Sequence, residues 1–364
     1  MNFKYKSEVI GKNGISARIV AKSKSAYSDT VIPTWEYDAP KCILAELNTH
    51  GMLVKNAQSS RAVPVKKVIE QIRNNPVTPV HWGSNQAGMV AGEEINNDVG
   101  IIQDRLRGSD EGDHLSRDEA WLVSADIVAD VMTAWEEAGY HKQIVNRIGE
   151  AFTMVRGVIT GTEIDNFFHL RYHKDADPYI QELARCMWEA YEQAETEVLY
   201  EGEWHTPYVD HKRNVIDGTL VYGYSGTESG MVYEDSSSVH ITRFKCVTLE
   251  EALKISAAAC GQVSYRKLDL SEETVDRVWN RLMTGDIIHA SVTGHQATPM
   301  SIFEASGGYG MDLDAYDITK GVTHVSVEDG QFWSAQFKHW IMHRKLIPNE
   351  SFKGKFVPPV GDNK

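Results

Sequence analysis

Residues 49–64 read THGMLVKNAQSSRAVP, and the interpretation of the whole chain starts from this stretch. Its short polar residues and single guanidinium follow neither the period of an amphipathic helix nor that of a strand. Arg61 offers a planar fork of donors suited to phosphate, and Ser59, Ser60 and Asn56 add neutral donors for a sugar or a base edge. The stretch therefore predicts a small-anion site. The alternative is a polar loop whose Ser and Asn residues cap the helix that follows.

A helix is expected directly after this stretch. Pro64 suits the first turn of a helix, and four apolar residues then recur at helical spacing: Val65, Val68, Ile69 and Ile72. The loop before the helix would direct backbone N–H groups toward the same anion.

Length and composition limit the class of protein. The chain has 364 residues, 42% of them hydrophobic, and a formal net charge of −14. This length suggests one large domain or two intimately packed ones, and the negative charge argues against a surface for duplex nucleic acid. The cysteines have no C-x-x-C spacing, and no apolar run reaches about 18 residues. We therefore expect a soluble, cytoplasmic, single-domain protein (residues 1–364) with reduced thiols and no membrane segment.

Capping motifs predict further helices. Ser116 and Glu119 form a capping box for a helix that ends at Gly139, and Asp177 with Pro178 opens another. The apolar residues expected to face inward on the first of these helices are Trp121, Ala125, Val128, Val131, Met132 and Trp135.

A further helix is expected after Asp269. Two other regions carry weaker patterns. Residues 1–40 predict a small hairpin followed by a Pro-bounded loop, interpreted as an N-terminal extension. Residues 204–249, rich in Gly, Ser, Tyr and Val, predict a strand-rich insertion that could act as a lid or be a long surface loop. Segregated helices and strands indicate an α+β fold.

Several segments besides residues 49–64 carry a resemblance to a known family. They are WGSNQAGM (82–89), KQIVNR (142–147), DNFFHLR (165–171), GEWHTPY (202–208), HAS (289–291) and HQATP (295–299). In this order they resemble the long form of the flavin-dependent thymidylate synthase family, in which the first stretch reads THRxxSRNxSSRAIP. The resemblance extends from about Leu44 to Glu350. The segment similar to HASPFEH precedes the RHR-type motif in short family members and follows it here, so the chain looks circularly permuted.

This resemblance implies a fold and an activity. The implied fold has mixed helices around an antiparallel sheet. The implied reaction is methylation of dUMP at C5 with methylene-tetrahydrofolate as the one-carbon donor, FAD as the carrier of reducing equivalents and NADPH as their source. The implied assembly is a homo-oligomer, either a tetramer or a dimer.

The resemblance also assigns residues to the nucleotide. Ser59, Ser60 and Arg61 match nucleotide-binding positions, and Arg147 and Arg171 match nucleotide-facing arginines. Arg61 and Arg171 are the implied catalytic residues, because a guanidinium stabilises negative charge on an activated pyrimidine. The alternative for Arg147 and Arg171 is an ion pair with a carboxylate such as that of Glu150 or Asp165 on a solvated face.

Six further residues match cofactor positions in the same family: His50, Asn56, Asn166, His289, Ser291 and His295. The histidines stand where the family has the histidine of its RHR motif and imidazoles that pack on flavin or folate. The alternative is that the asparagines are local caps and that the histidines are ordinary polar residues. No metal site is expected among these residues.

The chain departs from the family pattern at six positions, and several of the family residues replaced there face flavin or the reacting ring. Gly51 and Lys55 stand for arginines, Val54 for a serine and Gly294 for a glutamate, and Ala259 and Gln262 also replace arginines. Replacement cations could come from Lys55, Arg266 or Arg344.

Three interpretations remain open after these departures. The first is thymidylate synthesis with substituted contacts. The second is hydroxymethylation of dUMP or dCMP, in which weakened flavin binding leaves a C5 methylene group to react with water. The third interpretation is a non-catalytic nucleotide-binding homologue. The sequence does not distinguish uracil from cytosine as the base.

Overall fold

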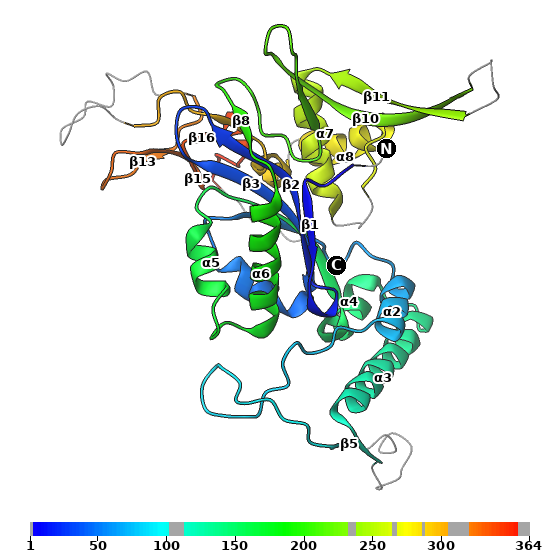
Figure 1. Ribbon diagram of the computed structural model, residues 1–364. Coiled ribbons are helices and arrows are strands. Elements are labelled where there is room, and N and C mark those ends of the chain that lie inside the picture. The colour runs from blue at the N-terminus through cyan, green and yellow to red at the C-terminus, as the bar shows by residue number, and fades with distance from the viewer. Residues whose placement is uncertain are drawn as a thin grey trace.

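The computed structural model describes residues 3–101, 113–231, 238–263, 268–285, 288–304 and 320–355. Its centre is a six-stranded sheet. Five strands follow the order β1 (Ser7–Ile10), β2 (Ser16–Ser25), β3 (Val31–Pro40), β7 (Met154–Thr160) and β4 (Val54–Ala57), all antiparallel, and β8 (Glu197–Leu199) pairs in parallel with the end of β2. Helices lie around this sheet (Figure 1). The predicted α+β class with antiparallel strands is therefore confirmed.

Residues 31–40 form a strand, so the predicted Pro-bounded loop is wrong. The proline that suggested a loop, Pro33, pairs with Lys22 of β2 but lies just before the segment of β3 that pairs with β7, which begins at Thr34. A proline without an N–H is tolerated at such a strand margin. β2 and β3 thereby contribute fully buried core side chains, including Ile19 and Trp35.

Two helices cover one face of the sheet. They are α5 (Asp165–Arg171) and α6 (Pro178–Gln193), which lie beside each other in Figure 1. As predicted, Asp177 caps α6, because its carboxylate accepts from the backbone N–H groups of Tyr179 and Ile180. Trp35 packs against this helix and donates from Nε1 to the carbonyl oxygen of Met187 at 3.0 Å. The short α1 (Leu44–Asn48) adds Leu47 to the same core.

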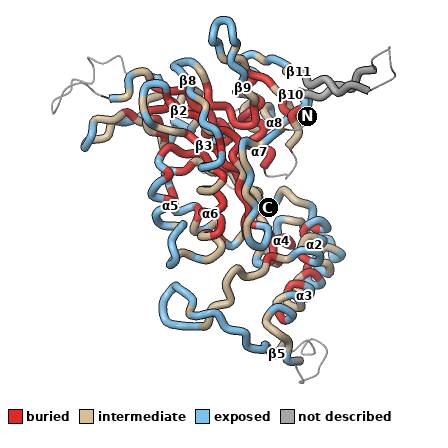
Figure 2. The backbone as a smooth tube through the Cα atoms, viewed as in Figure 1, coloured by how far each residue is buried: buried red, intermediate tan, exposed pale blue. Residues whose placement is uncertain are grey.

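The opposite face carries the second layer of helices, α7 (Leu249–Gln262) and α8 (Glu272–Met283). Val158 of β7 packs there with Tyr208 and Ala259. The helix expected after Asp269 is α8, and its prediction is confirmed. The tube in Figure 2 shows how the buried residues concentrate between these layers.

A helical lobe follows β4 in the chain. It consists of α2 (Val65–Asn74), α3 (Arg117–Glu137) and α4 (Lys142–Ile148), and its core contains all four apolar residues predicted on α2. The capping box of Ser116 and Glu119 is present, and the chain leaves α3 through Gly139 at a φ of 86°. The predicted inner face of α3 is only partly right, because Val131 and Trp135 are 37% and 40% exposed.

Residues 204–249 contain the three-stranded sheet of β9 (Asp210–Arg213), β10 (Leu220–Met231) and β11 (Ser238–Val247). In Figure 1 the long hairpin of β10 and β11 extends away from the central sheet, beyond α7. Its function as a lid stays a prediction.

The last part of the chain adds small sheets and 3-10 turns. These are β12 (Ala297–Pro299) with β16 (Trp340–Met342), and β13 (His324–Val325) with β14 (Phe332–Ser334) and β15 (Phe337–Lys338). The turns are η6 (Ala290–Gly294) and η8 (His343–Leu346); earlier turns are η1 (Lys12–Gly14), η2 (Lys41–Ile43) and η4 (Glu150–Phe152). β5 (Val99–Ile101) pairs with β6 (Asp113–Leu115).

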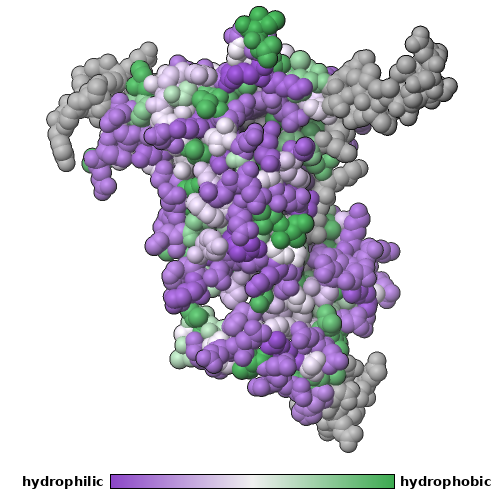
Figure 3. Space-filling view, viewed as in Figure 1, coloured by the Kyte–Doolittle hydropathy of each residue, from purple (hydrophilic) through white to green (hydrophobic). Residues whose placement is uncertain are grey.

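The surface in Figure 3 is mainly hydrophilic, with hydrophobic residues in small separate patches. All four cysteines are free thiols, and Cys186 and Cys260 are buried. None of the helices in the described ranges has the length and apolar character needed to span a bilayer.

Candidate functional site

The stretch that opened the sequence analysis borders a pocket of about 300 Å³. Residues 58–64 connect β4 to α2, and all of them except Arg61 line one wall of the pocket. The beginning of β7 forms another wall. The polar residues of the lining are Lys41, Gln58, Ser59, Ser60, Lys67, Gln71, Asn146 and Thr153. Two ammonium groups, hydroxyls and amides thus face a space large enough for a small ligand.

Ser60 and Lys41 line this pocket and also belong to a charged cluster with Glu150. Lys41, from η2, donates from Nζ to Ser60 Oγ and also contacts Glu150 Oε1 at 2.5 Å. Ser60 Oγ donates to the same carboxylate oxygen at 2.7 Å. Burial of Glu150 would raise its pKa, but the bonds from Lys41 and Ser60 outweigh burial and lower it. The carboxylate is therefore ionised and held by an ammonium and a hydroxyl.

Asn146 holds the loop in place from α4. This residue is 3% exposed, and its Nδ2 donates to the carbonyl oxygens of Ser60 and Val63 at 2.8 and 2.9 Å. Lys142 adds a bond from Nζ to the carbonyl oxygen of Ala62 at 3.3 Å. The KQIVNR segment therefore positions the loop through its lysine and its asparagine.

The predicted arginines of this region are exposed. The guanidinium of Arg61 has no hydrogen-bond or ion-pair partner within the described part of the chain, and its backbone N–H donates to Ser59 Oγ at 3.2 Å. Arg147 is also exposed, and its charge lowers the pKa of Glu150 further. Glu150 is one of the two carboxylates that the sequence analysis named as alternative ion-pair partners for Arg147 and Arg171.

A second cluster lies before β4. Arg171, on α5, donates from Nε to His50 Nε2 at 2.8 Å and from Nη1 to Glu46 Oε1, so its ion pair is with Glu46 rather than with Asp165. Lys55 donates from Nζ to the carbonyl oxygen of His50. Burial first, then the charges of Arg171 and Lys55, lower the pKa of His50. The neutral imidazole is an acceptor here.

β4 links these two clusters in sequence. His50 and Lys55 lie before and at its start, and the Ser59–Ser60 loop follows its end. Asn56 pairs with Val158 of β7 within the strand, and Asn166 is exposed on α5. Side chains alternate along a strand, so Lys55 and Asn56 point to opposite faces of the sheet.

The HAS and HQATP segments contain three of the predicted cofactor residues, which lie in and beside η6: His289, Ser291 and His295. His289 and Ser291 are exposed, whereas His295 is completely buried. His295 Nδ1 is hydrogen-bonded to Thr160 at 2.8 Å, and burial lowers its pKa to about 3. His289 and Ser291 are thus open to a ligand, and His295 belongs to the interior.

His295 ends a chain of fully buried hydrogen bonds across the sheet. Thr160 is bonded to Thr34 at 2.7 Å, and Thr34 to His205 Nε2 at 2.8 Å. Ser23 is bonded to the other ring nitrogen of His205 at 2.9 Å. Burial, followed by the charges of neighbouring histidines, lowers the pKa of His205 well below its usual range.

The departures from the family pattern have distinct surroundings. A Cβ at Gly51 would meet no heavy atom within 4 Å, whereas one at Gly294 would lie 3.0 Å from Val54 Cγ1. Two of the cations considered as replacements lie in the described residues. Lys55 donates to the carbonyl oxygen of His50, the residue before Gly51, and Arg344 pairs with Glu350 at 2.8 Å. Arg266 lies outside the described residues.

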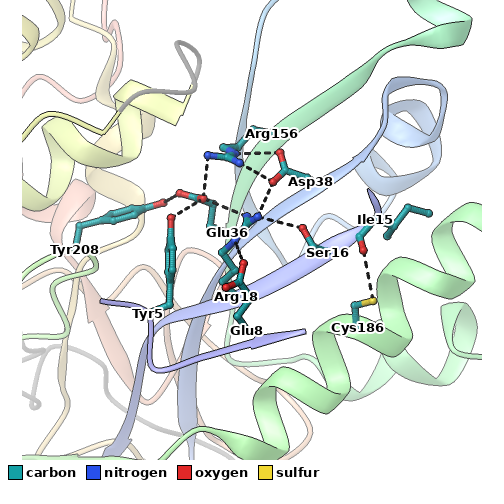
Figure 4. A network of polar contacts seen from close by, with 10 residues as sticks. All are labelled: Tyr5, Glu8, Ile15, Ser16, Arg18, Glu36, Asp38, Arg156, Cys186 and Tyr208. Carbon is teal, nitrogen blue, oxygen red and sulfur yellow. Dashed lines mark hydrogen bonds and ion pairs between the residues drawn. The ribbon is translucent and has the colours of Figure 1, made fainter. Parts of the chain in front are cut away.

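Ala259 and Gln262 line a small cavity of about 20 Å³ beside Glu36. Figure 4 shows the side chains that converge on this buried carboxylate: Tyr5 and Tyr208 donate at 2.8 Å each, and Arg18 and Arg156 lie 3.3 and 3.6 Å away. Both arginines come from sheet strands. Cationic groups are therefore present next to the two positions where the family has arginines.

Sequence reasoning missed Lys41, Lys67 and the role of Asn146 in the pocket. Lys41 belongs to none of the segments that the sequence analysis singled out, and only folding brings it to Ser60. Asn146 was within reach, because it belongs to the KQIVNR segment quoted for the resemblance.

No protein-family model matches this chain, and no curated protein matches it. Among the solved structures that are similar to this chain, two are of the UMP/dUMP methylase PolB from Streptomyces cacaoi. The form bound with 5-Br dUMP has 12% identity and a TM-score of 0.37, covering 51% of this chain and 93% of PolB. The form bound with 5-Br UMP has 15% identity and a TM-score of 0.32, covering 50% of this chain and 89% of PolB.

Proposed function

We propose that this chain binds a pyrimidine deoxynucleoside monophosphate beside residues 58–64 and transfers a one-carbon unit to C5 of its base. The observation that carries the proposal is the guanidinium of Arg61, which has no partner among the described residues and belongs to a loop whose Ser59 and Ser60 line a pocket with Lys41. A guanidinium, an ammonium and two hydroxyls are donors that a phosphate monoester uses.

The proposed substrate fits the charges of the pocket. A phosphate dianion gains from Arg61, Lys41 and Lys67, all of which belong to the loop or to the pocket lining. The overall charge of −14 does not oppose this, because a single nucleotide needs only a few local cations. Arg147, whose charge acts on Glu150, is a further cation proposed for the nucleotide. Arg171 is the arginine proposed to stabilise charge on the base.

The proposed cofactor is FAD, which would supply the reducing equivalent taken from NADPH, with methylene-tetrahydrofolate as carbon donor. His289, Ser291 and Asn166 are exposed and therefore fit a role in holding a planar cofactor. His50 presents a neutral ring beside the open space at Gly51. His295 does not fit direct contact with flavin, because it is buried and bonded to Thr160.

The resemblance that motivates this proposal also implies a circular permutation and a homo-oligomer, tetramer or dimer. Both belong to the proposal. Ultracentrifugation of the purified protein tests the oligomeric state.

A second candidate function is hydroxymethylation of dUMP or dCMP. It is favoured by the missing side chains at Gly51 and Gly294, which remove an arginine and a glutamate expected near the flavin and the reacting ring. If no hydride reaches the C5 methylene group, water adds to it instead: nucleotide, methylene-tetrahydrofolate and water give hydroxymethyl nucleotide and tetrahydrofolate. This balance requires no net oxidant or reductant.

The deciding experiment combines spectroscopy with product analysis. The purified protein is mixed with FAD, and its absorption spectrum is recorded before and after addition of dUMP or dCMP. NADPH oxidation and the nucleotide mass are then followed with methylene-tetrahydrofolate. Bound flavin with a methylated product supports the first function, and a hydroxymethylated product without NADPH oxidation supports the second. Nucleotide binding without any product identifies a binding protein, and no binding of dUMP or dCMP overturns the proposal.

A further inference from the structure

The carboxylate of Glu150 accepts hydrogen bonds from two groups, Lys41 and Ser60, that would also bind the proposed phosphate. Lys41 Nζ lies 2.5 Å from Glu150 Oε1, and Ser60 Oγ donates to the same oxygen at 2.7 Å. Lys41 and Ser60 both line the pocket. A carboxylate oxygen and a phosphate oxygen are equivalent acceptors for an ammonium and a hydroxyl, so both anions compete for one position.

The two partners differ in how firmly they are held. The side chain of Lys41 is 15% exposed, whereas that of Glu150 is 41% exposed. Glu150 belongs to the three-residue turn η4, which directly follows α4 of the helical lobe. The carboxylate can therefore rotate toward solvent while the ammonium stays at the pocket wall.

The backbone of the loop is also held by bonds that do not involve Glu150. Asn146 binds the carbonyl oxygens of Ser60 and Val63, and Lys142 binds that of Ala62. These bonds reach the backbone on both sides of Arg61 without involving a carboxylate. Removal of the charge on Glu150 therefore leaves the loop attached to α4.

We propose that Glu150 is an internal anion that occupies the phosphate position of the pocket and is displaced when a nucleotide monophosphate binds. This inference rests on the proposed function, because it specifies how the same pocket selects its ligand. A dianionic phosphate can replace the monoanionic carboxylate at Lys41, whereas an uncharged nucleoside has no group to do so. Glu150 thus favours nucleotides over nucleosides and over weak monoanions.

The test uses Glu150→Gln in the full chain, with dUMP and deoxyuridine as probes in isothermal titration calorimetry. Glutamine keeps the size of the side chain but removes the competing charge. The Kd for dUMP is expected to fall about fivefold, the change that corresponds to one partly exposed ion pair, while the Kd for deoxyuridine stays unchanged. Glu137→Gln, at the exposed end of α3, is the matched control and is expected to bind as the wild type does.

The outcomes separate the two proposals. If wild-type protein binds dUMP and Glu150→Gln binds it equally or more weakly, Glu150 is a structural partner of Lys41 and this inference is wrong, while the proposed function stands. If neither protein binds dUMP, both proposals are wrong. Should Glu150→Gln fail to fold by circular dichroism, Glu150→Asp replaces it: the shorter side chain withdraws from Lys41 and must also tighten dUMP binding.

Discussion

Arg171 donates from Nε to Nε2 of His50 across 2.8 Å, and this bond fixes the tautomer of the imidazole. Because Nε2 accepts, the proton of the neutral ring is on Nδ1. The same guanidinium pairs with Glu46, so it is held from two sides. The resemblance assigned His50 to the cofactor and Arg171 to the nucleotide; the structure makes them direct neighbours.

The first prediction concerns the protonation of His50. Its pKa is lowered by burial first and then by the positive charges of Arg171 and Lys55. Arg171→Leu removes one of these charges and is expected to raise the pKa of His50 toward 6.5, without reaching it, because burial remains. NMR titration of the imidazole in both proteins measures the change. An identical or lower pKa in the variant would show that the guanidinium does not act on this ring.

The second prediction concerns Arg61. Since its side chain has no partner in the described ranges, Arg61→Ala is expected to leave the free energy of unfolding within about 0.5 kcal/mol of wild type. Loss of a charged donor to phosphate is expected to raise the Kd for dUMP about tenfold to hundredfold. Calorimetric titration and thermal melting check both values. Arg73→Ala, which removes exposed ion pairs on α2, is the control and should bind dUMP normally.

The elements that the sequence predicted correctly have local signals. Pro64 precedes α2, Ser116 and Glu119 cap α3, and Asp177 caps α6, and each signal lies within a few residues of the helix it starts. β3 was missed because Pro33 is a loop signal by itself and becomes tolerable only through its place beside β2. That place depends on pairing with distant strands.

The residues of the candidate site also differ in whether a local sequence signal identifies them. Ser59, Ser60 and Arg61 are contiguous, so a motif could identify them. Their partners Lys41 and Glu150 are separated from each other by 109 residues in sequence, and only the packing of η2 against η4 brings them together. The inner face of α3 was predicted only partly correctly for a related reason. Apolar residues occur around the helix, and only tertiary contacts decide which of them are covered.

The third prediction concerns stability in acid. His205 and His295 are fully buried, and the pKa of His295 is lowered from 6.5 to about 3. The unfolded chain therefore binds more protons than the folded chain below about pH 6.5, and stability falls as the pH decreases from there. The expected slope is roughly 1.4 kcal/mol per pH unit for each histidine that stays neutral in the folded state.

Urea denaturation at pH 7.5 and pH 5.5 measures this loss in a range where exposed carboxylates remain ionised. The exposed His169 provides the comparison, because His169→Gln should leave the pH dependence as it is in wild type. Equal stability of wild-type protein at both pH values would mean that the buried histidines do not remain neutral.

The last prediction compares two substitutions that introduce residues found in the family that the sequence resembles. A side chain at Gly51 enters open space, so Gly51→Arg is expected to change the free energy of unfolding by less than about 0.5 kcal/mol. Gly294 is buried, and a Cβ there lies 3.0 Å from Val54 Cγ1, so Gly294→Glu adds both a close contact and a buried charge. It should cost roughly 2 kcal/mol or more.

Val54 is itself a departure, since the family has a serine there. Serine lacks the Cγ1 methyl group that approaches Gly294, so the double variant Val54→Ser with Gly294→Glu should be less destabilised than the sum of the two single variants. Urea denaturation of the four proteins in this cycle measures the coupling. If the effects simply add, the close approach of Val54 does not explain why the chain carries glycine at 294.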